Sequence, residues 1–309
     1  MTIASSVYRD PHFYMFHSNL ITFQGACDVV LSKSSSGADG FPFNLHARLT
    51  SPTTSNSPNA TSENYTYISH VSLMIEGEGA NKYLFQFGTE IETGAPVKLN
   101  GEHFASVDDD DKSIVEASSG LPFSVTRAII GERGNIVVYT FTFNNGSEVK
   151  IRVNLHFKML FIEVKGHFGG APVVGILGNI FKKGLFNREG ELMSDTDINS
   201  YGSEWQVRDD EVKLFVDKNR YPQYPDRCVI VDVVESKEDK NTNLRGGKNA
   251  STTSRRRLFD VNGGTSKFEN DANQACAHLK GRGVQLCIDD VLTVKNIEVA
   301  SDPFYEGIV

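Results

Sequence analysis

The sequence predicts an all-β protein: an antiparallel β-sandwich followed by a small α-helical appendage that carries a disulfide. Alternation of apolar and polar residues with period two dominates the first part of the chain and is clearest from residue 136 to 164. Two low-complexity stretches, residues 50–62 and 236–257, interrupt it. A length of 309 residues suggests about two domains. We therefore expect a β domain over 1–235, a flexible linker over 236–257 and an appendage over 258–309.

The first strong pair of strands lies on either side of the glycine-rich turn at residues 76–79. The apolar positions of these strands are Tyr65, Tyr67, Val71, Leu73 and Ile75, then Tyr83, Phe85 and Phe87. Their spacing is typical of antiparallel strands that turn one face to a core.

A second hairpin follows, with a turn at Asn145-Gly146 that favours type I′ geometry. The expected buried residues are Val137, Tyr139, Phe141 and Phe143, then Val149, Ile151, Val153, Leu155, Phe157 and Met159. The expected solvent-facing residues are Lys150, Arg152, Asn154, His156 and Lys158. After Met159 the alternation of apolar and polar residues shifts by one position, so that Leu160, Ile162 and Val164 become the apolar set. This shift indicates a bulge or a strand break.

The appendage contains one predicted helix. Asp271 is positioned to cap it, and its apolar face would consist of Ala272, Ala275, Cys276 and Leu279 before Gly281 ends it.

Charge and hydropathy exclude several classes of partner. With 31 basic and 39 acidic side chains the formal net charge is −8, which disfavours binding to nucleic acid or to an anionic membrane face. No stretch approaches the roughly 18 apolar residues of a membrane span, and the first residues lack a signal-peptide pattern.

Cysteines and glycosylation sequons suggest an extracellular protein that is secreted or displayed on the cell surface. The four cysteines, Cys27, Cys228, Cys276 and Cys287, form no CxxC pair and leave either two disulfides or four buried thiols. Cys276 and Cys287 are spaced for a local disulfide across a short loop, although two unrelated core thiols fit as well. Asn-x-Ser/Thr sequons occur at Asn59, Asn64, Asn145 and Asn249.

The most informative motifs resemble a von Willebrand factor type D (VWD) domain. Asp10-Pro11-His12-Phe13 is followed by a strand with Gly25-Ala26-Cys27, then by Gly175-Ile176-Leu177-Gly178-Asn179 and by a segment around Trp205. That family has an Asp-Pro-His-aromatic strand, a Gly-x-Cys strand, a Gly-Asn turn and a closing strand with a tryptophan. The resemblance covers residues 8–228 and predicts that residues 201–207 form that closing strand.

The resemblance also implies a disulfide arrangement. In that family the cysteine of the Gly-x-Cys strand pairs with one after the tryptophan strand, which here implies Cys27 with Cys228. An unpaired, buried Cys27 is the alternative. The segments around Cys276 and Cys287 resemble a paired-cysteine tail that often follows such domains.

The departures from the family concern its chemistry. Val174 and Leu177 stand where relatives have vicinal cysteines, which removes disulfide exchange. His17 replaces a calcium-binding aspartate, and the loop after Asn179 contains Lys182 and Lys183. These changes predict a degenerate site without calcium or another cofactor, because calcium needs anionic oxygens. The loop would instead be held by packing of Ile180, Phe181, Leu185 and Phe186.

One further acidic motif imitates a calcium loop. Asp195-Thr196-Asp197-Ile198-Asn199 matches the first ligand positions of an EF-hand, but Ser200 and Gln206 occupy the essential glycine and glutamate positions. We also expect no flanking helices and therefore interpret it as a solvated loop.

The sequence favours a non-enzymatic function. It contains none of the common nucleophile, zinc or phosphate-binding motifs, and its eight histidines are scattered. An active site assembled from residues that are far apart in the sequence stays an alternative. We therefore predict that the protein is a structural or adhesive building block of a matrix, cell wall, filament or surface layer. Its predicted partners are further copies of itself or other extracellular proteins. The alternative is a soluble module that binds a glycan or lipid.

Overall fold

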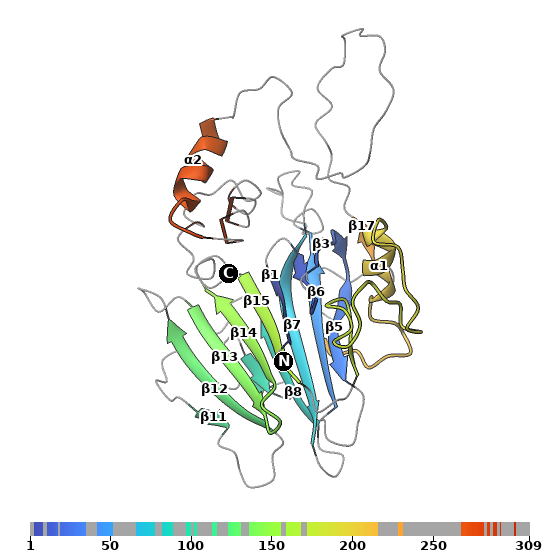
Figure 1. Cartoon of the computed structure of the whole chain (residues 1–309). Helices are drawn as coiled ribbons and strands as arrows, with labels where there is room; N and C mark the ends of the chain where they lie inside the picture. The colour runs from blue at the N-terminus through green and yellow to red at the C-terminus, as the bar shows by residue number, and fades with distance from the viewer. Residues whose placement is uncertain are drawn as a thin grey trace, which may run out of the picture. The chain divides into compact units, whose positions relative to one another are not determined.

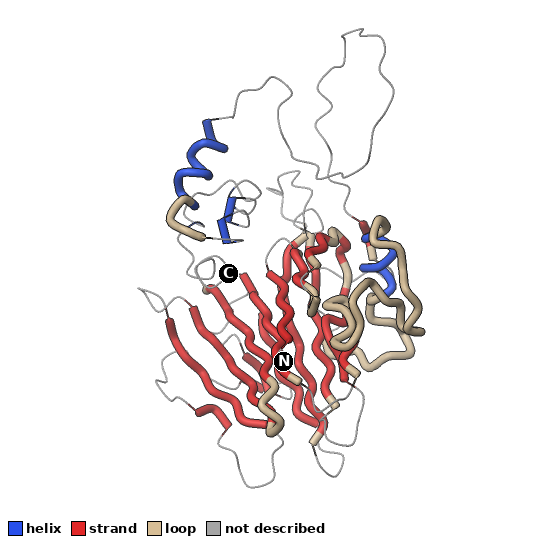
Figure 2. Tube along the Cα trace, in the orientation of Figure 1, coloured by secondary structure: helices blue, strands red, loops and turns tan. Residues whose placement is uncertain are grey.

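The structure is a computed structural model that is mostly β, with antiparallel sheets (Figures 1 and 2). It describes residues 3–8, 11–17, 19–34, 42–51, 66–77, 82–88, 97–99, 102–103, 113–115, 123–130, 136–155, 159–167, 172–215, 228–230, 267–280, 283–284, 287–288, 291 and 300. The chain divides into two compact units, Met1–Val233 and Val234–Val309, which we call unit 1 and unit 2. The expected linker, residues 236–257, lies outside the described residues.

The larger sheet of unit 1 has the strand order β11-β12-β13-β14-β15-β1-β2-β3. Its strands are β1 Ile3–Tyr8, β2 His12–Tyr14, β3 Leu20–Thr22, β11 Ser113–Val115, β12 Phe123–Ile130, β13 Ile136–Phe143, β14 Glu148–Asn154 and β15 Met159–Gly166. All neighbours pair antiparallel, including β1 with β15, which joins the start of the unit to its middle.

The second sheet has the order β10-β9-β8-β7-β6-β5-β16. Its strands are β5 Asp28–Ser34, β6 Phe43–Thr50, β7 Tyr67–Glu76, β8 Lys82–Gly88, β9 Val97–Leu99, β10 Glu102–His103 and β16 Val173–Val174. A small ribbon pairs β4, Gly25–Ala26, with β17, Val229–Ile230.

The core lies between the inner faces of the two sheets. Phe85 of β8 contacts Phe141 of β13 with ring centroids 4.8 Å apart, and Tyr83 contacts Phe123 across the same interface. Most of the residues predicted to face inward are buried; they are Val71, Leu73, Ile75, Phe85, Phe87, Val137, Tyr139, Phe141, Phe143, Val149, Ile151 and Val153. Tyr67, Tyr83 and Leu155 are half-buried, and Tyr65 and Phe157 lie outside the described residues. Period-two patterning thus identified the strands and their inner faces.

The turn between β13 and β14 differs from the two-residue type I′ prediction. The Gly146 N–H donates to the Phe143 carbonyl (2.8 Å) and the Phe143 N–H donates to Ser147 (2.9 Å). Gly146 has φ of 77°, so the connection is three residues long and ends on a glycine in the left-handed region. The turn therefore lies one residue earlier than predicted.

The predicted change of phase after β14 is a strand break. β14 ends at Asn154 and β15 begins at Met159, after which Leu160, Ile162 and Val164 are buried. The expectation that Asn154 faces water is wrong. It is buried, because it lies between paired residues of both neighbouring strands, Ile136 and Met159, where the chain turns. His156 and Lys158 lie outside the described residues.

Two expectations about residues 195–207 differ from the structure. The segment expected to be a closing strand contains helix α1, Ile198–Glu204. The acidic motif, expected to be a solvated loop, is exposed at Asp195 and Asp197 but ends inside this helix, which includes Ile198 and Asn199. Asp197 caps it by accepting a hydrogen bond from the Ser200 N–H (3.0 Å). Tyr201 and Trp205 are both buried, and their i, i+4 spacing places them on one side of the helix, as it would in a strand.

Unit 2 contains helix α2, Lys267–Cys276. Asp271 lies inside this helix and does not cap it, because the helix begins at Lys267, four residues before Asp271. Ala272, Cys276 and Leu279 are buried as expected. Among the described residues, no helix combines the length and apolar character needed to cross a membrane.

Candidate functional site

The segments that resemble VWD motifs meet at one edge of unit 1. The Ile176 N–H donates to the Val30 carbonyl (3.0 Å), and the Val30 N–H donates to the Trp205 carbonyl (2.8 Å). The opening motif joins through Phe16, whose N–H donates to the Leu177 carbonyl (3.1 Å). Segments that are far apart in the sequence therefore pack as one assembly.

Close backbone approach explains two of the motif glycines. A Cβ on Gly175 would lie 2.3 Å from the Leu31 carbonyl oxygen, and a Cβ on Gly25 would lie 2.2 Å from the Phe23 ring. The Tyr201 hydroxyl donates to the carbonyls of Gly175 (3.2 Å) and Ile176 (3.1 Å), and burial raises the pKa of this tyrosine. A side chain at Gly175 would push the turn away from β5.

The other motif residues lie as follows. Pro11, His12 and Phe13 are buried beside or in β2, and the His12 ring is hydrogen-bonded to the Thr22 hydroxyl (2.9 Å). Gly178 has φ of 95°, which favours glycine. Asp10 lies outside the described residues.

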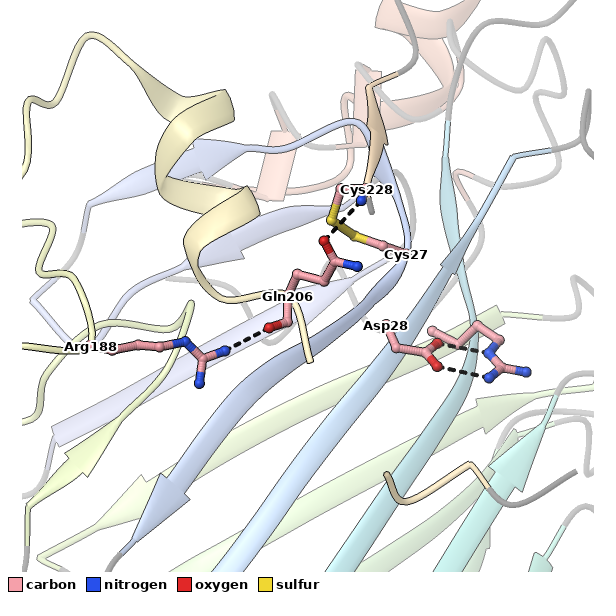
Figure 3. Close-up of a disulfide and its surroundings, with 6 residues drawn as sticks. Cys27, Asp28, Arg188, Gln206 and Cys228 are labelled. Carbon is pink, nitrogen blue, oxygen red and sulfur yellow. Dashed lines mark hydrogen bonds and ion pairs between the residues drawn. A yellow bond between two sulfur atoms is a disulfide. The ribbon is translucent and has the colours of Figure 1, made fainter. Parts of the chain in front are cut away.

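A disulfide joins Cys27 to Cys228, the pairing that the resemblance implied. Their α-carbons are 4.8 Å apart and the two residues are separated by 201 positions. The Cys228 N–H donates to the Gln206 side-chain oxygen (2.9 Å), so a second contact holds the end of unit 1 at the same place (Figure 3). In unit 2 a disulfide joins Cys276 to Cys287, with α-carbons 5.9 Å apart.

Arg188 connects the loop over residues 179–193 to the chain that follows α1. Its guanidinium donates to the Gln206 carbonyl (2.6 Å; Figure 3). It also donates to the Glu204 carbonyl (2.8 Å) and forms an ion pair with Glu211. The same group lies 5.1 Å from the centre of the Trp205 ring. Each of the three guanidinium nitrogens of this half-buried arginine therefore donates a hydrogen bond within unit 1.

Glu211 is the anionic centre of this network. Lys33 of β5 forms a second ion pair with it (2.8 Å), and the Arg208 N–H donates to its other oxygen (3.0 Å). Partial burial raises the pKa of Glu211, but the hydrogen bonds from Lys33, Arg208 and Arg188 outweigh that effect and lower the pKa to about 2. The carboxylate is thus ionised at all physiological pH values.

Residues 206–215, which we call the closing segment, cover the outer face of the second sheet. The Leu214 carbonyl accepts hydrogen bonds from Gln86 of β8 (2.7 Å) and Ser72 of β7 (3.4 Å), and the Leu214 side chain is buried. The Phe215 ring packs under the guanidinium of Arg48 at 4.7 Å and edge-on to His70. The outer face is therefore buried as a polar layer.

His46 of β6 lies in this layer with only 2% of its surface exposed. Desolvation lowers its pKa to about 3; Glu211 opposes this effect, and Lys33 and Arg188 add to it. Its Nδ1 atom has no hydrogen-bond partner within the described part of the chain. The imidazole is therefore neutral in the folded protein.

Asp28, next to the disulfide, forms the second ion pair of the layer. Both of its carboxylate oxygens accept from Arg48, each at 2.8 Å (Figure 3). Burial raises the pKa of Asp28, and the two hydrogen bonds from Arg48 oppose that rise. This two-point contact fixes the start of β5 against β6.

The resemblance places a degenerate calcium site around His17 and Asn179. The Asn179 side-chain oxygen accepts from the Phe181 N–H (2.8 Å), and the Nε2 atom of His17 is buried without a hydrogen-bond partner in the described residues. In the part of the chain that the structure describes, no three His, Cys, Asp or Glu side chains are grouped to hold a metal ion.

The packing predicted for this loop is correct in part. Ile180 and Leu185 are buried and Phe186 is half-buried, but Phe181 is 56% exposed. The Asn179-Lys182 turn directs Phe181 away from the core.

Of the four sequon asparagines, one is among the residues that the structure describes. Asn145 is half-buried in the β13–β14 turn, and its side-chain oxygen accepts from the Ser147 N–H (2.9 Å). Asn59, Asn64 and Asn249 lie outside the described residues.

No protein family model and no curated protein matches the chain.

Sequence reasoning missed Arg188, Glu211, His46 and the Asp28–Arg48 pair. Lys33 and Glu211 are 178 positions apart, and nothing local marks either residue. The one usable signal was in β6 and β7, where both faces of the strands are buried although histidine, arginine and serine occupy the outer positions.

Proposed function

We propose that the protein is a non-enzymatic, extracellular structural module, in which unit 1 is a VWD-like building block of a matrix, wall, filament or surface layer. The observation that carries this proposal is the Cys27–Cys228 disulfide. It joins a residue near the start of unit 1 to one near its end, so tension applied along the chain passes through the disulfide. The second sheet and strands β11 to β15 of the first lie between these cysteines and are bypassed, whereas β1 to β3 precede Cys27 and stay in the path of the load.

The charged groups around the disulfide support a structural use of the site. Arg188, Glu211 and Lys33 satisfy one another, and Arg48 holds Asp28 at two points. A group that binds or transforms a ligand needs unsatisfied donors or acceptors directed at that ligand. Here these groups instead hold the closing segment on the sheet.

The VWD type is supported by three features of unit 1. The motif segments occur in the family's order, they are hydrogen-bonded to one another through Val30, Ile176 and Trp205, and the disulfide has the family's pairing. Helix α1 stands where relatives have a strand, which is a departure within the closing motif. Two disulfides favour an oxidising compartment, as secretion requires.

Assembly of the purified, disulfide-bonded chain tests this proposal. We expect sedimentation velocity to show association that increases with protein concentration, and electron microscopy to show regular polymers or layers. A monodisperse chain that binds one glycan on an array, or one lipid in vesicles, would contradict the proposal and support a soluble binding module.

A further inference from the structure

We propose that the closing segment is a tethered strap that acid opens, and that His46 of β6 is the group that senses the pH. This opening is a movement within unit 1 and does not require the self-association of the proposed function.

The closing segment crosses the second sheet above His46. It begins beside β5, where the Val207 N–H donates to the Asp28 carbonyl (2.8 Å). Its far end lies on β7, where the Leu214 carbonyl accepts from the Ser72 hydroxyl (3.4 Å). β6 is the strand between β5 and β7, and His46 is the residue of β6 that pairs with Ser72. The segment therefore covers His46, which is 2% exposed.

Few contacts hold the closing segment on the sheet. Residues 206–215 form neither a helix nor a strand. Leu214 alone among them is buried, and five of them are exposed. A segment with few buried side chains opens at a much lower cost in free energy than the core of a domain.

The face beneath the segment is polar, which lowers the cost of uncovering it. His46, Arg48 and Ser72 lie on this face. When the segment leaves, water can replace the hydrogen bonds that the Leu214 carbonyl accepts from Ser72 and Gln86. An apolar face would lose its burial without such a replacement.

Both ends of the closing segment are tethered. Trp205, directly before it, is buried, and its carbonyl accepts from the Val30 N–H (2.8 Å). Cys228, beyond the segment, is bonded to Cys27. An opened segment therefore stays attached to unit 1 on both sides and can close again while the two sheets remain folded.

Closure keeps the His46 imidazole neutral. Its Nδ1 atom has no hydrogen-bond partner within the described part of the chain. Burial lowers the pKa of His46 from 6.5 to about 3; Glu211 opposes this effect, and Lys33 and Arg188 add to it. Opening returns the imidazole to water, where it takes up a proton below about pH 6.5. Because the open form binds this proton more tightly, acid favours the open form.

The pH range separates His46 from the carboxylates of the layer. The pKa of Glu211 is lowered, so its protonation favours opening only below about pH 4.5. Burial raises the pKa of Asp28, so protonation of Asp28 favours the closed form instead. His70 of β7 also faces the segment, edge-on to Phe215, and its Nδ1 atom is hydrogen-bonded to the Ser69 hydroxyl (2.9 Å). A variant of His70 therefore provides the control.

Hydrogen exchange in the full, disulfide-bonded chain tests the opening. After division by the intrinsic exchange rates, we expect exchange of residues 207–215 to rise about 25-fold between pH 7 and pH 5. This is the factor by which proton uptake by His46 at a pKa of 6.5, instead of about 3, favours the open form. The amides of β13 should not change, and a return to pH 7 should restore the protection of the segment.

Two histidine variants assign the sensor. H46Q should reduce the rise to less than about twofold, whereas H70Q should retain it. A rise that H46Q retains would overturn the role of His46. Equal exchange of residues 207–215 at both pH values, or a parallel rise in β13, would overturn the strap.

The wild-type chain provides a test that needs no variant. Nuclear magnetic resonance should show the His46 ring neutral at pH 5 in every molecule whose closing segment is protected. A protonated ring beneath a protected segment would overturn the proposal.

Discussion

The two faces of the second sheet of unit 1 are buried by different means. The inner face packs phenylalanine and aliphatic side chains against the first sheet, as in the contact of Phe85 with Phe141. The outer face is a layer of His46, Arg48 and Ser72 under the closing segment. Apolar packing tolerates a change of partner, whereas each buried polar group needs a particular partner.

This difference has a consequence for how the unit is stabilised. The inner face is a continuous apolar cluster that adds stability with every buried side chain. The outer layer is fixed at a few points: the Arg188–Glu211 pair, the Leu214 carbonyl and the Cys27–Cys228 bond. We therefore expect the outer layer to respond to redox state and pH, and the inner face to respond mainly to side-chain volume.

The largest effect should follow from removing the long-range disulfide. The variant C27S/C228S should lose about 4 to 5 kcal/mol of unfolding free energy, because the bond closes a loop of about 200 residues. The variant C276S/C287S opens a much shorter loop and should lose about 3 kcal/mol in unit 2. Urea denaturation followed by separate probes for the two units measures both losses. Equal losses would contradict the role assigned to loop length.

Truncation on the inner face should come next. Phe141→Ala removes a fully buried ring that contacts Phe85 and Phe87, and we expect a loss of about 4 kcal/mol. Thr140→Ala, one position away on the outward face of β13, should change stability by less than about 0.5 kcal/mol. Chemical denaturation of both variants tests the facing of this strand. A large loss of stability in Thr140→Ala would mean that Thr140 does not lie on the outward face of β13.

Removing a contact that holds the closing segment should cause a smaller loss of unfolding free energy. Arg188→Ala should cost about 2 kcal/mol, because it leaves two carbonyls without their donor and removes one of the three partners of Glu211. Arg208→Ala removes an exposed arginine that also pairs with Glu204, and should cost less than about 0.5 kcal/mol. Hydrogen exchange should locate the first loss in residues 206–215. Equal protection of these amides in both variants would contradict the proposed anchoring.

The smallest effect is the pH dependence of the outer layer. The folded pKa of His46, about 3, lies below the unfolded value of 6.5, so stability is present above pH 6.5 and is lost as the pH falls. Between pH 7 and 5.5 this loss should reach about 1 kcal/mol. Glu211 contributes only below about pH 4.5. His46→Gln should flatten the difference between the two pH values. An unchanged slope would show that another group titrates.

The sequence was sufficient for the inner face and insufficient for the outer layer, for a physical reason. Alternation in β13 and β14 marks residues that all face one apolar region, so each strand can be interpreted by itself. The partners of Glu211 are Lys33 and Arg188, in separate parts of the chain, and their pairing depends on the fold. Helix α1 was missed because its glycine and serines have low helix propensity and the Tyr201–Trp205 spacing fits a strand as well as a helix.

The resemblance carried information that periodicity lacked. It linked Cys27 to Cys228 across the whole of unit 1, a pairing that no local pattern could select. It misled at residues 201–207, where the family's strand is replaced by a helix. Motif order therefore predicted which segments meet, and local propensity decided which element each segment forms.

Stretching single molecules of the full chain is the most direct test of the claim that tension passes through the disulfide. With the chain held at its two ends, the oxidised protein should unfold without releasing residues 28–227, because the Cys27–Cys228 bond bridges them. Reduction, or the C27S/C228S variant, should add roughly 700 Å of contour length, at about 3.5 Å for each of the residues released. An oxidised chain that extends to the same length as the reduced chain would contradict the account.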